Sequence, residues 1–123
     1  MALRLRRSEL SVPASSIKMM EKAIASEADL VFLDLEDAVA PAQKEAARKN
    51  AIEALRIGNW GRKVRAIRVN GADTHWAHDD VIEMVEGAGE FLDVIIVPKP
   101  KAPRDIWFFG TLLSQLEDRK SVV

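Results

Sequence analysis

The stretch Leu30-Val31-Phe32-Leu33-Asp34-Leu35-Glu36-Asp37 joins four consecutive apolar residues to three carboxylates. A short apolar run that ends in charged residues is typical of a strand buried on both faces. A second run of this kind, Val94–Val97, is followed by a proline. The two stretches therefore predict strands of a parallel sheet, with polar residues directly after their carboxyl ends.

Two weaker strand candidates and four helical patterns surround these runs. The strand candidates, Leu10–Pro13 and Val64–Val69, contain β-branched residues. Apolar residues recur at helical spacing in four further stretches: Ile17–Ile24, Ala47–Leu55, Val81–Ala88 and Ile106–Leu116. The resulting order, βαβαβαβα, predicts a parallel α/β sheet with right-handed crossovers. Four such units fit an open sheet or half of an eight-unit barrel, and their number alone does not choose between them.

Length and composition restrict the class of protein. The 123 residues allow one ordinary domain, and 48% apolar with 30% charged residues can form a buried core. The 18 Lys and Arg nearly balance the 19 Asp and Glu, which disfavours nucleic acid and anionic membranes as partners. Cysteine is absent, so disulfides and thiolate chemistry are excluded. No apolar stretch approaches the roughly 20 residues of a membrane span, and we expect a cytoplasmic protein.

The acidic residues after the second predicted strand are the first candidates for function, because ligands bind beyond the carboxyl ends of parallel strands. Asp34, Glu36 and Asp37 lie within four positions and repel one another unless a cation, an arginine or water offsets their charge. They are interpreted either as the neighbourhood of a divalent cation or as a helix cap at Asp34 or Asp37 with the other acids solvated.

Basic residues follow the third and fourth predicted strands. The planar guanidinium of Arg68 suits a substrate carboxylate, whereas an internal ion pair with Glu36 or Asp37 is an equally simple interpretation. Lys99 stands between two prolines that restrict its backbone, although a loop lysine is more often solvated. Asn70 follows Arg68 by two positions.

The residues after the first predicted strand begin a helix. Ser15 and Ser16 offer hydroxyl groups at the helix N-terminus, where a phosphate can bind, but either residue serves more simply as an N-cap. His75 and His78 lack the spacing and partners of a zinc site and are expected at the surface.

Several motifs occur in one order along the chain. They are Arg7-Ser8-x-Leu10-x-Val12-Pro13-x-Ser15, Met20-Glu21-Lys22-Ala23, Leu33-Asp34-Leu35-Glu36-Asp37-Ala38-Val39-Ala40-Pro41 with Lys44, Arg68-Val69-Asn70-Gly71-x-Asp73-Thr74, and Val97-Pro98-Lys99. From about Arg7 to Glu117, the chain resembles the N-terminal half of the HpcH/HpaI aldolase and citrate lyase beta-subunit superfamily. Within that superfamily it is most similar to the malyl-CoA and methylmalyl-CoA lyases.

The resemblance implies that residues 1–117 are the (βα)4 half of a TIM (β/α)8 barrel. It implies a Mg²⁺-dependent CoA ester lyase, which breaks or forms a carbon–carbon bond in a 3-hydroxyacyl-CoA such as malyl-CoA. The partners would be the small-molecule acyl-CoA thioester and an oxoacid such as glyoxylate, and the parent enzyme would be a homo-oligomer. Two alternatives remain: a receiver-like phosphoacceptor domain, and a non-catalytic half-barrel that self-associates.

The resemblance also implies catalytic roles. Arg68 would bind the oxoacid, while Glu36 and Asp37 would order the water shell of the metal without binding it directly. The family's direct metal ligands are a glutamate at the fifth strand and an aspartate at the sixth, and a catalytic acid comes from a neighbouring subunit. None of these three is in this sequence, so we expect the chain alone to be inactive.

The segment from Ser11 to Lys22 matches the family's CoA-contacting loop. Ser11 and Ser16 stand where some lyases carry an aromatic residue and an arginine, and Ala14 replaces the usual glycine. The candidate substrate-binding residues are Arg68, Lys22, Ser11, Ser16, Asn70 and Lys99.

The resemblance stops abruptly after Glu117. The last six residues, Asp118–Val123, are the peptide that one reading frame of a common sequencing adapter encodes before a stop codon. We therefore expect residues 118–123 to be a non-native tail.

Overall fold

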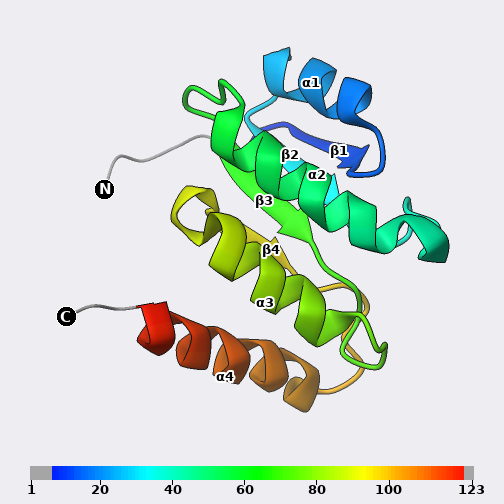
Figure 1. Cartoon of the computed structure of the whole chain (residues 1–123), viewed down its shortest axis with the longest axis vertical. Helices are drawn as coiled ribbons and strands as arrows, with labels where there is room; N and C mark the ends of the chain where they lie inside the picture. The colour runs from blue at the N-terminus through cyan, green and yellow to red at the C-terminus, as the bar shows by residue number, and fades with distance from the viewer. Residues whose placement is uncertain (1–6, 121–123) are drawn as a thin grey trace.

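A computed structural model describes residues 7–120 and shows strands alternating with helices along the chain (Figure 1). Two short 3-10 helices, η1 and η2, precede α2 and β4. The elements are β1 (Glu9–Pro13), α1 (Ile17–Ala25), β2 (Leu30–Asp34), η1 (Pro41–Gln43), α2 (Lys44–Ile57), β3 (Val64–Arg68), α3 (Ala77–Ala88), η2 (Gly89–Phe91), β4 (Val94–Ile96) and α4 (Pro103–Lys120). All four predicted strands and all four predicted helices are therefore present.

The four strands form one parallel sheet in the order β1-β2-β3-β4, and the helices gather on one face of it (Figure 1). An open doubly wound sheet carries helices on both faces and reverses its strand order at a switch point. The observed sheet does neither, so the predicted (βα)4 half of a TIM barrel is confirmed. The receiver-like alternative is wrong for the same reason, because that fold is doubly wound.

The main hydrophobic core lies between the helices and the sheet. Alternate strand residues such as Val31, Leu33 and Ile67 point into it and are fully buried. Small residues of α2, among them Ala47 and Ala51, are also fully buried and allow that helix to pack closely against the strands.

The sequence predicts helix caps at a serine and at an acidic residue, and the structure confirms only the serine cap. The Ser16 hydroxyl accepts a hydrogen bond from Met19 N at 3.2 Å and caps α1. Neither Asp34 nor Asp37 caps a helix, because η1 comes first and α2 begins at Lys44 without a side-chain cap. The capping interpretation of these acids is therefore wrong.

The other face of the sheet carries a second apolar cluster. Leu30, Val64 and Ala66 form its buried part, and Phe32, Val94 and Ile96 are partly exposed around them. No helix within residues 7–120 covers this face, which corresponds to the interior of a barrel. The strands β1 and β4 are the two edges of the sheet.

The final helix includes part of the expected tail. It extends to Lys120, so residues 118–120 are helical, and residues 121–123 lie outside the described part of the chain. Their non-native origin stays a prediction. None of the helices in the described residues is long and apolar enough to cross a membrane.

We predict that the isolated 123-residue chain self-associates, because an uncovered apolar sheet face and two strand edges favour pairing with another molecule. Sedimentation velocity should show a sedimentation coefficient that rises with concentration. Val94→Lys places a charge on that face and should reduce the association. Ile57→Lys, at a position 74% exposed on α2, should not. A monomeric wild-type chain at all concentrations would contradict the prediction.

Candidate active site at the carboxyl ends of the strands

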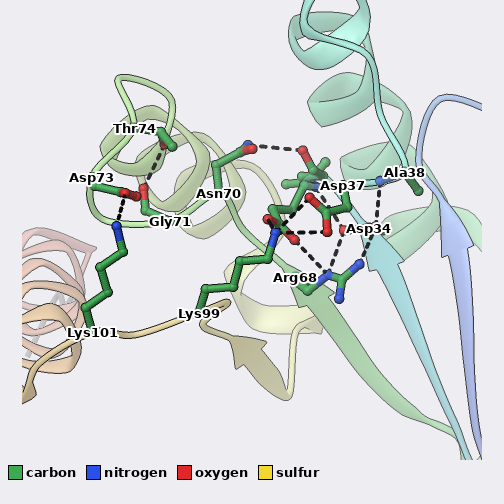
Figure 2. A network of polar contacts seen from close by, with 12 residues as sticks. Asp34, Asp37, Ala38, Arg68, Asn70, Gly71, Asp73, Thr74, Lys99 and Lys101 are labelled. Carbon is green, nitrogen blue, oxygen red and sulfur yellow. Dashed lines mark hydrogen bonds and ion pairs between the residues drawn. The ribbon is translucent and has the colours of Figure 1, made fainter.

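A bidentate ion pair between Asp34 and Arg68 joins the carboxyl ends of β2 and β3 (Figure 2). The register places Asp34 opposite Arg68. Arg68 Nε donates to Asp34 Oδ1 at 3.0 Å, and Arg68 Nη2 donates to Asp34 Oδ2 at 2.7 Å. Asp34 is fully buried, whereas the Arg68 side chain is 27% exposed. Such a bidentate pair holds the guanidinium plane in one orientation at the rim of the sheet.

Asp34 also organises the loop that follows it. Its carboxylate accepts hydrogen bonds from the backbone N–H groups of Glu36, at 2.9 Å, and Ala38, at 3.1 Å. We call residues 35–39 the acidic loop. Burial alone would raise the pKa of Asp34, but the hydrogen bonds from Arg68, Glu36 and Ala38 outweigh it and lower the pKa below its ordinary value of 3.8.

The two carboxylates of the acidic loop, on Glu36 and Asp37, lie close to Arg68 and Lys99, and Figure 2 shows Asp37 beside Lys99. Glu36 Oε1 lies 3.5 Å from Arg68 Nε. Lys99 Nζ donates to Glu36 Oε2 and to both carboxylate oxygens of Asp37, each at 3.0 Å. The structure therefore brings together Arg68, Glu36, Asp37 and Lys99, as the sequence predicts for residues at adjacent strand ends.

The main partner of Arg68 differs from the expectation. The sequence interpretation paired Arg68 with Glu36 or Asp37, but its hydrogen-bonded partner is Asp34, with Glu36 as a second and longer contact. The reason is the strand register, which sets Asp34 directly beside Arg68. Asp37 instead pairs with Lys99, whose hydrogen bond lowers the pKa of Asp37.

Lys99 reaches the acids from a constrained backbone. It is the one residue other than glycine in the described chain with a positive φ, of 43°. This left-handed conformation is uncommon for a side chain with a Cβ atom. Its side chain is 67% exposed, so its ion pairs with Glu36 and Asp37 are largely solvated.

The acidic pair fits a hydrated metal ion better than direct coordination. Glu36 Oε1 is buried and has no hydrogen-bond partner among the described residues. A metal-bound water would supply the donor that this oxygen lacks. The described residues contain no group of three or more His, Asp or Glu side chains that could hold a metal ion. Glu36 and Asp37 are thus better suited to accept hydrogen bonds from ion-bound water than to coordinate an ion directly.

Asn70 lies below the acidic loop and is only 2% exposed. Its amide donates to the carbonyl oxygen of Leu35, at 3.0 Å, and to Asp80 Oδ2, at 2.6 Å. Asp80 in turn accepts a hydrogen bond from Arg48 Nε at 2.7 Å. Asn70 therefore holds the acidic loop in place through the backbone of Leu35. The sequence analysis did not identify Asp80 or Arg48 as members of this network. The spacing could have indicated Arg48, because it follows Lys44 by one helical turn and lies on the same, buried face of α2.

The three candidate CoA contacts lie on the first βα unit. Ser11 is exposed on β1 and pairs in register with Phe32. Ser16 caps α1, and Lys22 is exposed in the last turn of that helix. No hydrogen bond or ion pair of the described residues joins Lys22 to the acidic loop or to Arg68, so the structure does not bring these two groups into contact.

The sheet, with an arginine and acids at the carboxyl ends of its strands, has the architecture of half a TIM barrel with its functional residues at the usual rim. The profile of the HpcH/HpaI aldolase/citrate lyase family matches residues 7–119. The chain is 42% identical over 117 residues to L-malyl-CoA/beta-methylmalyl-CoA lyase of Cereibacter sphaeroides, which covers 95% of this chain and 37% of that protein. The chain therefore belongs to the HpcH/HpaI aldolase/citrate lyase family.

Solved structures agree with this assignment. CitE of Mycobacterium tuberculosis, in complex with magnesium, acetoacetate and coenzyme A, is similar with a TM-score of 0.68 at 28% identity, over 86% of this chain and 38% of that one. A malate synthase of Haloferax volcanii reaches a TM-score of 0.81 over 97% of this chain and 38% of that one, at 18% identity, and supports the fold alone. The chain thus spans less than two fifths of each of these relatives.

We predict that Asp34→Asn lowers the free energy of unfolding by about 2–3 kcal/mol, because it leaves the partly buried Arg68 without its carboxylate. The wild type should also lose stability as the pH falls from about 3.8 through the lowered pKa of Asp34, because the unfolded carboxyl takes up a proton first. The variant should lack this part of the acid dependence.

Urea unfolding between neutral pH and about pH 3 measures both effects. Asp79→Asn, at an exposed carboxylate of α3, is the control and should change stability by less than about 0.5 kcal/mol. An equal loss in the two variants would show that the ion pair contributes nothing specific.

Proposed function

We propose that this chain forms the N-terminal half of a Mg²⁺-dependent CoA ester lyase. The reaction is aldol-type cleavage or formation of a carbon–carbon bond between an acyl-CoA and an oxoacid, with malyl-CoA and glyoxylate as the model substrates. The observation that carries the proposal is the Arg68 guanidinium, which is held at the barrel mouth beside Glu36 and Asp37. The 42% identity to a malyl-CoA lyase supports the same substrate class.

Arg68 binds the oxoacid in this proposal. Two of its N–H groups are used by Asp34, and the remaining N–H groups on the other edge of the guanidinium stay available for a carboxylate or carbonyl oxygen. The cation also lies over the Phe32 ring, with Cζ 5.3 Å from the ring centroid. These contacts orient Arg68 before the substrate arrives, which reduces the entropy cost of binding.

Glu36 and Asp37 would accept hydrogen bonds from water bound to Mg²⁺, and the direct ligands of the ion would come from the part of the lyase that this chain does not cover. When bound, Mg²⁺ would offset the negative charge that develops on the substrate oxygens. Lys99 reduces the repulsion between the two carboxylates. Without those ligands the chain alone should be inactive. The catalytic acid would come from a neighbouring subunit, so the complete enzyme would be a homo-oligomer.

The proposal is tested by a completed barrel, in which residues 7–117 are joined to the C-terminal part of the Cereibacter sphaeroides lyase. This protein should release glyoxylate from malyl-CoA in a Mg²⁺-dependent reaction, while the 123-residue chain should not. A folded but inactive completed barrel would contradict the proposed function.

In the completed barrel, Arg68→Lys should reduce kcat/KM by about 100-fold, because an ammonium cannot pair with Asp34 and the oxoacid in the same planar geometry. Arg65→Lys changes the same residue type on the same strand, at a position paired with Val31 and away from the carboxyl end. This control should keep activity within about twofold of the wild type. Glyoxylate release under initial-rate conditions measures both, and full activity of Arg68→Lys would exclude the role given to Arg68.

A further inference from the structure

Lys44, the first residue of α2, is a buried lysine beneath the acidic loop. It is only 5% exposed. Its Nζ donates to the carbonyl oxygens of Leu35 and Glu36, both at 2.9 Å, and lies 4.9 Å from the centroid of the Trp76 ring. It forms no ion pair with any carboxylate in the described part of the chain. Lysine is almost never buried in this way unless its charge is compensated, so the position needs an explanation.

The two carbonyl groups belong to successive peptides that set the direction of the site carboxylates. Leu35 O also accepts a hydrogen bond from Asn70 Nδ2, at 3.0 Å, and Glu36 O accepts one from Val39 N, at 3.2 Å. With Lys44, each carbonyl therefore has two donors, which restrains the rotation of both peptide planes. The side chains of Glu36 and Asp37 extend from the Cα atoms on either side of the second peptide.

Lys44 bonds to the backbone and takes none of the carboxylate oxygens of Glu36 and Asp37, which pair with Lys99 instead. Lys44 places a positive charge below the loop without occupying an oxygen of Glu36 or Asp37, so both carboxylates stay available to Lys99 and that of Glu36 also to Arg68. The support continues through Asn70 to Asp80 and Arg48, which link the loop to α3 and α2.

We propose that Lys44 is a positioning residue, which holds the acidic loop so that Glu36 and Asp37 present their carboxylates beside Arg68 without touching the substrate. The inference rests on the proposed function of that site. It predicts that removal of the ammonium disorders the loop and weakens the effect of Mg²⁺, while binding of the acyl-CoA is unchanged.

Lys44→Met is the informative variant, because methionine fills a similar volume and donates no hydrogen bond. Each carbonyl keeps its second donor, from Asn70 or from Val39 N, so the fold should survive. Arg56→Met is the matched control. Arg56 lies near the other end of α2, donates to Gly87 O at 3.0 Å and lies 5.4 Å from the centroid of the Phe91 ring.

The experiment uses the completed barrel, with amide hydrogen exchange as the first measurement. The N–H groups of Glu36 and Ala38, which bond to Asp34, should exchange about tenfold faster in Lys44→Met. Amides in the middle of α3 should be unchanged, and Arg56→Met should leave the loop amides as in the wild type. The second measurement is the Mg²⁺ concentration for half-maximal activity, which should rise about tenfold while the KM for malyl-CoA stays within about twofold.

The outcomes separate the two proposals. Unchanged exchange at Glu36 and Ala38 in Lys44→Met overturns the inference, whether or not the barrel is active. Faster exchange there in a barrel whose wild type is inactive supports the inference and contradicts the proposed function. Failure of Lys44→Met to fold, or equal acceleration at all core amides, would show that Lys44 is required for the fold as a whole, which also overturns a positioning role.

Discussion

The buried ion pair between Asp34 and Arg68 ties together the ends of β2 and β3, and the rest of the site is arranged around it. Asp34 has no exposed surface, so its charge must be met by donors from the protein. Arg68 supplies two of them, and the backbone N–H groups of Glu36 and Ala38 supply the others. The same carboxylate therefore orients the guanidinium and shapes the acidic loop. It thereby couples the position of Arg68 to the positions of Glu36 and Asp37.

Three cations from different elements offset the charge of the three acids at this edge of the sheet. Arg68 comes from β3, Lys99 follows β4, and Lys44 begins α2. Lys44 is 5% exposed, whereas the Lys99 side chain is largely solvated. Water screens the charge of Lys99 more strongly, so its electrostatic interaction with the acids is weaker. The buried cation bonds to the backbone, whereas the exposed one bonds to the carboxylates of Glu36 and Asp37.

The one-sided arrangement of the helices explains both the site and the uncovered face. Parallel strands joined by right-handed crossovers place every helix on the same side when the strands follow one another in order. Because the strands are parallel, their carboxyl ends all lie at one rim of the sheet, where Arg68 and the acidic loop are in contact. The opposite face keeps an apolar cluster around Val64 and Ala66, as expected for the inner wall of a TIM barrel in the HpcH/HpaI aldolase/citrate lyase family.

Local patterns in the sequence were sufficient for the strands, the helices, the strand-end residues and the family, because periodicity and motif order are properties of neighbouring residues. They could not decide that Arg68 pairs with Asp34, since that choice depends on the register of two strands separated by a whole helix. Nor could they show that Lys44 and Asn70 are buried beneath the acidic loop. Burial and hydrogen-bond partners are set by segments that meet only when the sheet and its helices pack, so only the tertiary structure determined them.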